Sequence, residues 1–354
     1  MFGTGWTRRA RRDTRRRYRL RSASLAALAL ASAGSSVLSA DSALAATGWQ
    51  KVTPMPYGRV AEAATEGLNG HVYVIAGVIC CHQPLYTMDY NPTTKTWSKL
   101  PPPPDLKGSG ELSDSAAATG PKGLIYHLGG GSSDMSEIWT PRGELEGLSL
   151  SAKTWTVEAS MPTPRGMLAA ATGPDGRIYA LGGLANDGNL GTSTAIVEAY
   201  VPSLNSWTTA PSMQQARTNF AAVIGPDHRL YAIGGEYVNF NTGCCQLLAS
   251  VEAFSFTTHT WTYVAPLPTA AMIAGAVVGA DGRIYAVGQE IGYGANGPQG
   301  LWAYDVKTNS WTTLTAPPVA GVATGVGTNK SIVVVGPETS SSRPSNGPTY
   351  IYAT

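Results

Sequence analysis

The sequence contains few charged residues, few histidines and few cysteines. Only 14% of its 354 residues are Asp, Glu, Lys or Arg, whereas 43% are hydrophobic. A disordered chain combines low hydrophobicity with high charge, so this composition excludes disorder and predicts a folded protein. The five histidines are scattered, and no set of histidine and cysteine has the spacing of a metal site. We therefore expect no metal and no cofactor.

The sequence also lacks an apolar run long enough to cross a membrane. Residues 24–38 form a run of 15 residues diluted by Ser and Gly, whereas a membrane-spanning helix needs about 20. Nine arginines between Arg8 and Arg21 precede this run, and Ala43-Leu44-Ala45 follows it. This order is typical of a cleavable export signal. We expect residues 1–45 to be removed and the mature protein, without a membrane anchor, to be secreted or held in the cell envelope.

The route of export stays open. Residues 14–20, with the sequence Thr-Arg-Arg-Arg-Tyr-Arg-Leu, resemble the bacterial twin-arginine signal, although Arg19 stands where that motif prefers Leu. The general secretory route is the alternative. Both routes place the mature protein outside the cytoplasm.

Removal of this segment reverses the sign of the net charge. The whole chain has 25 Lys and Arg against 23 Asp and Glu, a net charge of +2. Residues 1–45 hold nine arginines and two aspartates, so 16 basic and 21 acidic residues remain, a net charge of −5. Nucleic-acid binding depends on basic side chains that neutralise phosphates. The composition therefore argues against a nucleic-acid partner.

Glycine and proline are abundant, with 41 and 24 residues, and the strongest signal in the chain is an internal repeat. Six tryptophans recur at intervals of 48 to 58 residues: Trp49, Trp97, Trp155, Trp207, Trp261 and Trp311. A glycine pair after an apolar segment recurs between them, as in Leu128-Gly129-Gly130 and Leu181-Gly182-Gly183. Each unit of about 52 residues contains four short predicted strands separated by turns.

These residues resemble the kelch repeat, whose blades carry a double glycine followed by a spaced tryptophan. The resemblance covers residues 48–354, although the double glycine is degraded in blades one, five and six. It predicts an all-β, six-bladed kelch-type propeller over residues 46–354. Five complete units end at a tryptophan, and the sixth lacks its last strand. We expect residues 48–52, around Trp49, to supply that strand and close the ring.

Three arginines stand at one repeat position, just before the innermost strand of their blades: Arg59, Arg165 and Arg217. The other three blades have Leu112, Ala271 and Val319 there. The loops at one mouth of a propeller form its binding surface, so three arginines grouped there suit an anionic ligand. The kelch resemblance implies a different role, hydrogen bonding to the backbone of the neighbouring blade. Both interpretations stay open.

Other candidate ligand-binding residues are acidic or aromatic and lie in variable loops of the predicted mouth. They are Asp114, Trp139, Glu236, Tyr237, Glu290 and Tyr293. Aromatic faces of this kind stack on sugar rings or peptides. Glu146, Glu198 and Glu252 each precede a tryptophan by nine residues, which indicates a role in the repeat itself. We assign no catalytic residue.

The four cysteines form two adjacent pairs, Cys80-Cys81 and Cys244-Cys245. An oxidising compartment favours disulfides. We predict a disulfide within each pair, although neighbouring Cα atoms lie closer than the usual disulfide span. A bridge between the two loops, free thiols and a metal site are the alternatives.

These observations favour an exported, monomeric binding module that holds a glycan, a peptide or a protein on its loops. The alternative is a sugar-processing enzyme, similar to the exported bacterial kelch protein that mutarotates sialic acid. That alternative rests on the export signal, the blade count and the three arginines.

Overall fold

The computed structural model describes ten stretches of the chain, and the structural statements below concern these residues. They are residues 48–59, 62–77, 85–106, 112–133, 139–185, 191–290, 298–319, 324–328, 331–336 and 346–354. All of them belong to the larger of the two units into which the chain divides, Leu38–Thr354. The predicted export signal, Cys80, Cys81 and Tyr293 lie outside the described residues.

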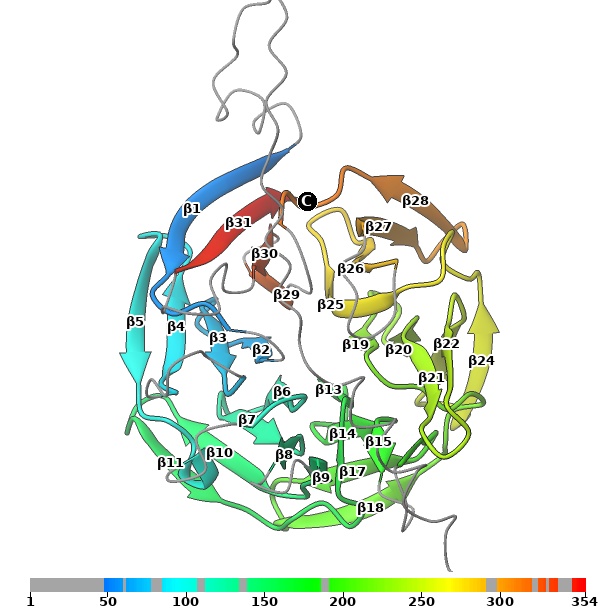
Figure 1. The fold of residues 1–354 in the computed structure, drawn as a ribbon, viewed down its shortest axis with the longest axis horizontal. Helices are drawn as coiled ribbons and strands as arrows, with labels where there is room; N and C mark the ends of the chain where they lie inside the picture. The colour runs from blue at the N-terminus through cyan, green and yellow to red at the C-terminus, as the bar shows by residue number, and fades with distance from the viewer. Residues whose placement is uncertain are drawn as a thin grey trace, which may run out of the picture. The chain divides into compact units, whose positions relative to one another are not determined.

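Six four-stranded antiparallel sheets, the blades, surround a common centre in the described part of the chain (Figure 1). From its innermost to its outermost strand, blade one contains β2 (Ala63–Glu66), β3 (Val72–Ile75), β4 (Thr87–Asn91) and β5 (Thr96–Leu100). In the same order, blade two contains β6 (Ala116–Thr119), β7 (Ile125–Leu128), β10 (Leu145–Ser149) and β11 (Thr154–Val157). Blade three contains β13 (Ala169–Thr172), β14 (Ile178–Leu181), β17 (Val197–Val201) and β18 (Ser206–Ala210).

The other three blades follow the same order. Blade four contains β19 (Ala221–Ile224), β20 (Leu230–Ile233), β23 (Val251–Ser255) and β24 (Thr260–Val264). Blade five contains β25 (Met272–Val278), β26 (Ile284–Gln289), β27 (Gln299–Asp305) and β28 (Ser310–Leu314). Blade six contains β29 (Thr324–Thr328), β30 (Ser331–Val335), β31 (Gly347–Ala353) and β1 (Trp49–Met55). The predicted all-β kelch propeller is confirmed.

The first and last strands of the described chain belong to one blade. β1 pairs antiparallel with β31, with Trp49 opposite Tyr352 and Val52 opposite Thr349. The innermost strands contact one another in blade order, and β29 of blade six contacts β2 of blade one. Residues 48–52 therefore occupy the outer-strand position that the sequence predicted for them.

The hydrophobic cores lie between neighbouring blades. The second strand is buried along its whole length in blades one to five, as in β14 and β20, because both of its faces meet another sheet. The outer strands are less buried, as in β11 and β18, which have no fully buried residue. Between blades three and four, Tyr179 and Leu181 pack in one cluster with Leu230. A blade by itself would leave such a face in water, so the blades stabilise one another by burying it.

The repeated tryptophans join each blade to the one before it. Each indole Nε1 donates a hydrogen bond to a backbone carbonyl in the segment that follows the outer strand of the preceding blade or, in one case, lies within it. The bonds are 2.7–3.0 Å long: Trp49 to Thr315, Trp97 to Thr53, Trp155 to Pro101, Trp207 to Ala159, Trp261 to Pro211 and Trp311 to Ala265. The bonds of Trp49 and Trp97 tie blade six to both neighbours.

The double glycines form a second connection between blades, closer to the centre. The N–H of the second glycine donates to the carbonyl that precedes the innermost strand of the next blade: Gly130 to Arg165 (3.1 Å), Gly183 to Arg217 (2.9 Å) and Gly235 to Ala271 (2.8 Å). These three glycines have φ values of 93 to 97°, which non-glycine residues rarely adopt. The requirement is also steric, because a Cβ on Gly235 would lie 2.5 Å from the carbonyl oxygen of Thr218.

The ends of the blades form two faces. The turn face carries the tight turns between first and second strands, such as residues 173–176, and the loop face carries the double glycines and the longer connections. On the loop face, connections of blades three and four form a further five-stranded sheet: β12 (Arg165–Gly166), β15 (Leu184–Ala185), β16 (Thr192–Ser193), β21 (Glu236–Asn239) and β22 (Cys244–Leu247). A hairpin of blade two, β8 (Gly131–Ser133) with β9 (Trp139–Pro141), lies there too. Among the described residues the one helical element is the 3-10 helix η2 (Pro104–Leu106).

We predict that Gly235→Ala lowers the free energy of unfolding by about 2–4 kcal/mol, because the backbone must move away from the added Cβ and the bond to Ala271 weakens. Gly282→Ala is the matched control. Gly282 also has a positive φ, 76°, but no atom lies within 4 Å of its added Cβ, so its cost should be about 1 kcal/mol. Chemical denaturation measures both. Equal losses would show that the close contact with the carbonyl of Thr218 is not what requires glycine at position 235.

Candidate functional site

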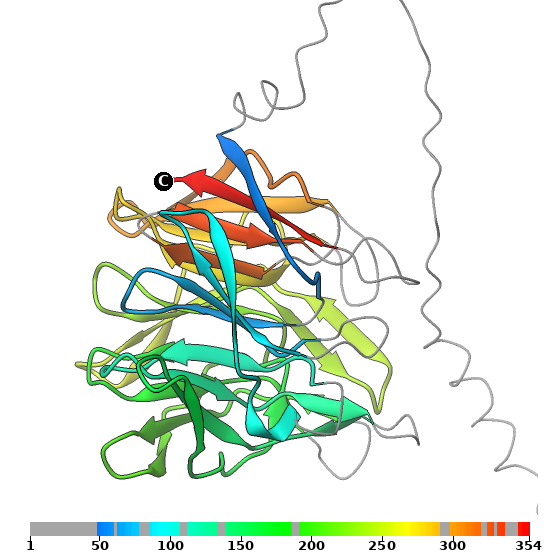
Figure 2. The ribbon, with the colours of Figure 1, turned by 90° about the vertical axis from the view of Figure 1, so that its left-hand side faces the viewer.

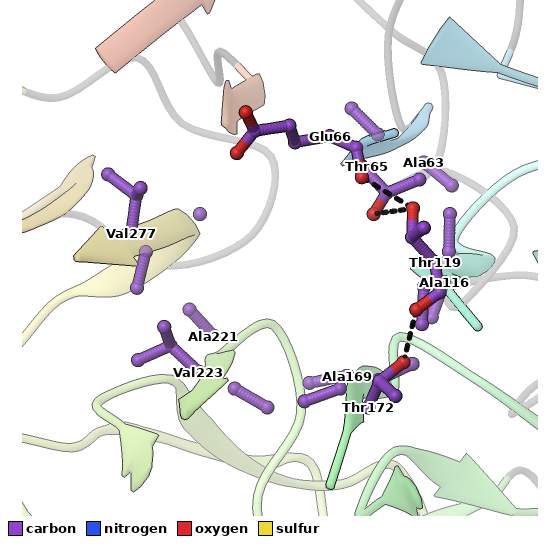
Figure 3. Close-up of a pocket in the computed structure, with 18 of the residues that line it drawn as sticks. Ala63, Thr65, Glu66, Ala116, Thr119, Ala169, Thr172, Ala221, Val223 and Val277 are labelled. Carbon is purple, nitrogen blue, oxygen red and sulfur yellow. Dashed lines mark hydrogen bonds between the residues drawn. The ribbon is translucent and has the colours of Figure 1, made fainter. Parts of the chain in front are cut away.

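A cavity of about 460 Å³ lies inside the ring of innermost strands (Figure 3). It is lined by residues 62–66, 115–119, 168–172, 220–224 and 274–278, which belong to the innermost strands of blades one to five and, in blades one to four, to the residue before each strand. Alanine accounts for 12 of these 25 residues. Small side chains on the inner strands leave the centre of the ring open. A cavity of this size falls in the range that holds small ligands.

Threonines close part of the turn-face end of this cavity. The hydroxyl of Thr119 donates to the carbonyl of Glu66 (2.5 Å), and the hydroxyl of Thr172 donates to the carbonyl of Thr119 (2.7 Å) (Figure 3). These carbonyls lie on the edge strands of their sheets, so the hydroxyls satisfy acceptors that have no partner strand. Three blades are thereby joined at this end.

The three arginines predicted at the mouth are buried inside their blades. Arg59, Arg165 and Arg217 are each 0% exposed. Their guanidinium groups donate to backbone carbonyls of the second strand of their own blade: Arg59 to Ala76 (2.8 Å), Arg165 to Ala180 (3.0 Å) and Arg217 to Gly234 (2.7 Å). This corrects both interpretations of the sequence. The arginines do not lie open to an anionic ligand, and their side chains bind their own blade.

Two of these arginines form buried ion pairs with the repeated glutamates. Arg165 lies 2.5 Å from Glu198, and Arg217 lies 2.7 Å from Glu252. Burial lowers the pKa of both guanidinium groups, and the carboxylate beside each opposes that shift. The structural role predicted for these glutamates is confirmed. Arg59 lacks such a glutamate in its blade, where Met88 stands at the register, and burial lowers its pKa to about 10.

Blades without the arginine fill its place in other ways. Blade two has Leu112, and its Glu146 carboxylate lies 3.4 Å from Nδ1 of His127. Blade five has Ala271, and the fully buried indole of Trp302 occupies the glutamate register and packs with Ala271. Gly300 leaves room for that indole, since an added Cβ there would lie 2.1 Å from it. The arginine and the glutamate therefore do not always occur together: blade one has Arg59 without the glutamate, and blade two has Glu146 without the arginine.

We predict that Arg217→Ala lowers the free energy of unfolding by about 3–5 kcal/mol, because it leaves the Glu252 carboxylate buried without its cation. The double change Arg217→Ala with Glu252→Ala should lower the free energy of unfolding by less than the sum of the two single changes. A double-mutant cycle, measured by chemical denaturation, gives that coupling energy. Additive losses would show that the ion pair contributes nothing of its own.

A row of three backbone hydrogen bonds joins blades two to five at the loop-face end of the cavity. Asp114, Met167, Asn219 and Ile273, each two residues after the arginine position, form this rim. The N–H of Met167 donates to the backbone carbonyl of Asp114 (2.7 Å), that of Asn219 to the carbonyl of Met167 (3.0 Å) and that of Ile273 to the carbonyl of Asn219 (2.9 Å). Asp114, Met167 and Asn219 have φ values of 60, 54 and 51°. An alignment of the repeats on the arginine position would have identified these rim residues from the sequence.

The structure brings two of the predicted acidic residues to this rim. Asp114 is partly buried and accepts a hydrogen bond from the Ser113 hydroxyl (2.7 Å). Glu236 is 1% exposed, and its Oε1 accepts a hydrogen bond from the amide of Asn219 (2.9 Å). Asn219 was not predicted from the sequence. It connects Glu236, which belongs to the same blade, to the rim.

The remaining predicted residues lie farther along the loop face. Tyr237 is half-buried on β21, and Glu290 is half-buried after β26, where its N–H donates to Pro298 (3.1 Å). Trp139 begins β9, and Cys245 lies exposed on β22 next to Cys244. The pairing of the four cysteines stays a prediction. Ligand contacts by these residues also stay predictions.

Burial raises the pKa of the Asp114 carboxyl to about 6, and the hydrogen bond from Ser113 opposes this shift. The folded-state pKa lies above the unfolded value, so the folded protein loses stability as the pH rises through the range from about 4 to 6 and does not regain it above pH 6. We predict that Asp114→Asn raises Tm at pH 8 by about 2 °C and changes it little at pH 4. Asparagine also tolerates the positive φ. A lower Tm at both pH values would contradict this prediction.

Metal ligands and membrane-spanning helices are not found in the described part of the chain. No group of three or more histidine, cysteine, aspartate or glutamate residues there is arranged to hold a metal ion. Within the same residues, no helix has the length and apolar character needed to cross a membrane.

Comparisons with known proteins agree with this architecture. A family model for the kelch motif matches residues 165–214 and 217–268, which are blades three and four with their ion pairs and double glycines. The chain is 28% identical to Kelch-like protein terF of Aspergillus terreus over 266 residues, covering 71% of this chain and 54% of terF. It is 31% identical to human Kelch-like protein 34 over 157 residues, covering 42% of this chain and 23% of the human protein. The matched region is thus about half the length of terF and about a quarter of the length of Kelch-like protein 34.

A solved structure, that of YjhT, superimposes with a TM-score of 0.64 at 15% sequence identity. The match covers 84% of this chain and 95% of YjhT, and it supports the fold alone. With six tryptophan registers, double-glycine connections and the kelch match in blades three and four, the chain is a kelch-repeat β-propeller protein.

Proposed function

We propose that this propeller is a binding module that holds a protein or peptide partner on its loop face. The observation that carries the proposal is the five-stranded sheet β12-β15-β16-β21-β22, which we call the wall. The blades have all four of their strands without it. The chain therefore builds ordered structure on the loop face beyond what the ring requires, and loops held on a rigid scaffold are where binding residues concentrate.

The wall has a small core and internal bonds of its own. Met167, Leu184 and Val238 form a buried cluster against which Phe240 packs. The Ser193 hydroxyl accepts a hydrogen bond from the N–H of Val238 (2.8 Å), which joins the two loops. A preformed surface binds a partner at a lower entropic cost than a mobile loop does.

The exposed groups of the wall suit a polypeptide partner. Asn241, Thr242 and Gln246 are exposed near its tip, and Tyr237 is half-buried on β21. Amide and hydroxyl groups can donate to and accept from a peptide backbone, and a tyrosine offers an apolar ring with a polar end. The β21–β22 hairpin lies on the side of the blades away from the C-terminus (Figure 2).

The enzyme alternative loses one of its three supports, the arginines. The arginines were to hold an acidic sugar at the mouth, and the structure buries all three inside the blades. Carbohydrate binding through the wall and export by residues 1–45 stay predictions that accompany the proposal.

Peptide and glycan arrays probed with the wild-type protein and two variants test the proposal. In the first variant an Asn-Gly turn replaces residues 240–243, which lie between β21 and β22 and include Phe240. In the control variant, Thr257→Ala with Thr258→Ala changes an exposed turn of blade four. We expect peptide signals that the first variant loses and the control keeps, with little change in Tm.

Array signals that survive the change to the β21–β22 turn would overturn the wall as the binding surface. A response restricted to glycans would replace the polypeptide partner with a carbohydrate. For any acidic sugar that binds, accelerated anomer exchange in NMR spectra would favour the enzyme instead.

A further inference from the structure

Lys99 lies between two tyrosine rings near the loop-face end of blade one. It is the residue before the last in β5, the strand that leads back to the loop face. Its Nζ lies 4.8 Å from the ring centroid of Tyr57 and 5.0 Å from that of Tyr86. These distances are within the range of cation–π attraction. We call Tyr57, Tyr86 and Lys99 the tyrosine clamp.

The two rings of the clamp are held by different parts of the fold. Tyr57 follows β1 of blade six and packs against the core between blades one and two. Tyr86 precedes β4 and packs against the core between blades six and one. The carbonyl of Tyr86 also accepts a hydrogen bond from the buried guanidinium of Arg59 (2.5 Å). Since β1 and β5 are in contact (Figure 1), closure of the ring brings the two tyrosines to the lysine.

The ammonium group of Lys99 forms no ion pair with any described carboxylate. Six of the seven described arginines do form ion pairs with an aspartate or a glutamate, and the seventh, Arg59, is buried. Lys99 is exposed, and both tyrosines are half-buried. The rings attract the ammonium group without neutralising its charge. The clamp therefore presents a positive charge, held in place, at the loop face.

A positive charge held in this way suits a carboxylate. A lysine side chain loses conformational freedom when it pairs, and the rings have already restricted that freedom, so the entropic cost of binding is lower. The ring faces that meet in the clamp are covered by the ammonium group, so a sugar ring has no room to stack on them. The tyrosine hydroxyls remain, and they can donate to and accept from a peptide backbone.

We infer that the tyrosine clamp binds the carboxylate of a glutamate or aspartate side chain of a polypeptide. The ammonium group of Lys99 donates to the carboxylate oxygens, and the rings contact the aliphatic stem of the acidic residue. The clamp belongs to blade one and the end of β1, whereas the wall is built from blades three and four. The clamp is thus a separate site, and the inference does not rest on the wall.

The direct test measures binding of acetylated hexaglutamate to the full chain at low ionic strength by calorimetry. Hexaglutamine, which has the same backbone and stem without the charge, is the ligand control. We expect hexaglutamate to bind and hexaglutamine not to bind. Lys99→Gln should weaken binding about threefold to fivefold, as expected for the loss of one exposed ion pair. Lys99→Arg keeps the cation and should bind nearly as well as the wild type.

Lys51→Gln is the matched protein control. Lys51 is exposed on β1 and has no cation–π contact among the described residues. The variant has the same charge change as Lys99→Gln, and its binding should match that of the wild type. The variant with the changed β21–β22 turn should also bind hexaglutamate as the wild type does, because the clamp lies in another part of the ring.

Equal binding of hexaglutamate and hexaglutamine would overturn the inference. Equal losses by Lys99→Gln and Lys51→Gln would also overturn it, since they would indicate attraction by net charge alone. Hexagalacturonate separates the two sources of a carboxylate: if it binds more tightly than hexaglutamate, the clamp holds an acidic sugar and the polypeptide ligand is wrong. Hexaglutamate binding that needs Lys99, without wall-dependent array signals, would support the clamp and refute the wall.

Discussion

The hydrogen bond from the second glycine of a blade to the carbonyl at the start of the next blade is the interaction on which the centre of this molecule depends. In blades three and four that carbonyl belongs to an arginine, Arg165 or Arg217, whose side chain turns back into its own blade. One residue therefore joins two sheets, by its backbone to one and by its guanidinium to the other. The rim of the cavity begins two residues later, so these bonds also position the candidate site.

The same arrangement decides the charge of the loop face. A guanidinium that satisfies backbone carbonyls and a buried glutamate is unavailable to a ligand, and exposing it would leave those acceptors without donors. The cations of blades one, three and four are thus used for architecture. The rim keeps a partly buried carboxylate, Asp114, whose ionisation burial disfavours. The alanine-lined cavity therefore has none of these three positive charges at its entrance.

Much of the fold could be predicted because each repeat contains the same pattern of short strands, turns, glycines and a tryptophan. The tryptophan spacing identified the blades, and the missing last strand predicted the pairing of β1 with β31. The glutamate register also predicted a structural role. Residues such as Asn219 and Met167 could not be singled out, since they differ from blade to blade and their backbone hydrogen bonds join different blades. The wall was missed for a related reason: two variable loops pair across blades through Thr192 and Asn239.

The sequence by itself determined the repeat, the all-β class and the strand that closes the ring, because hydrophobic patterning and turn residues act over short stretches of chain. It left the direction of each arginine open, since an arginine before an inner strand can extend outward or fold back with the same backbone pattern. Only the tertiary structure decided this, by bringing carbonyls and glutamates of distant strands within reach of the guanidinium groups. Burial then made pairing obligatory, because a buried charge without a partner is costly.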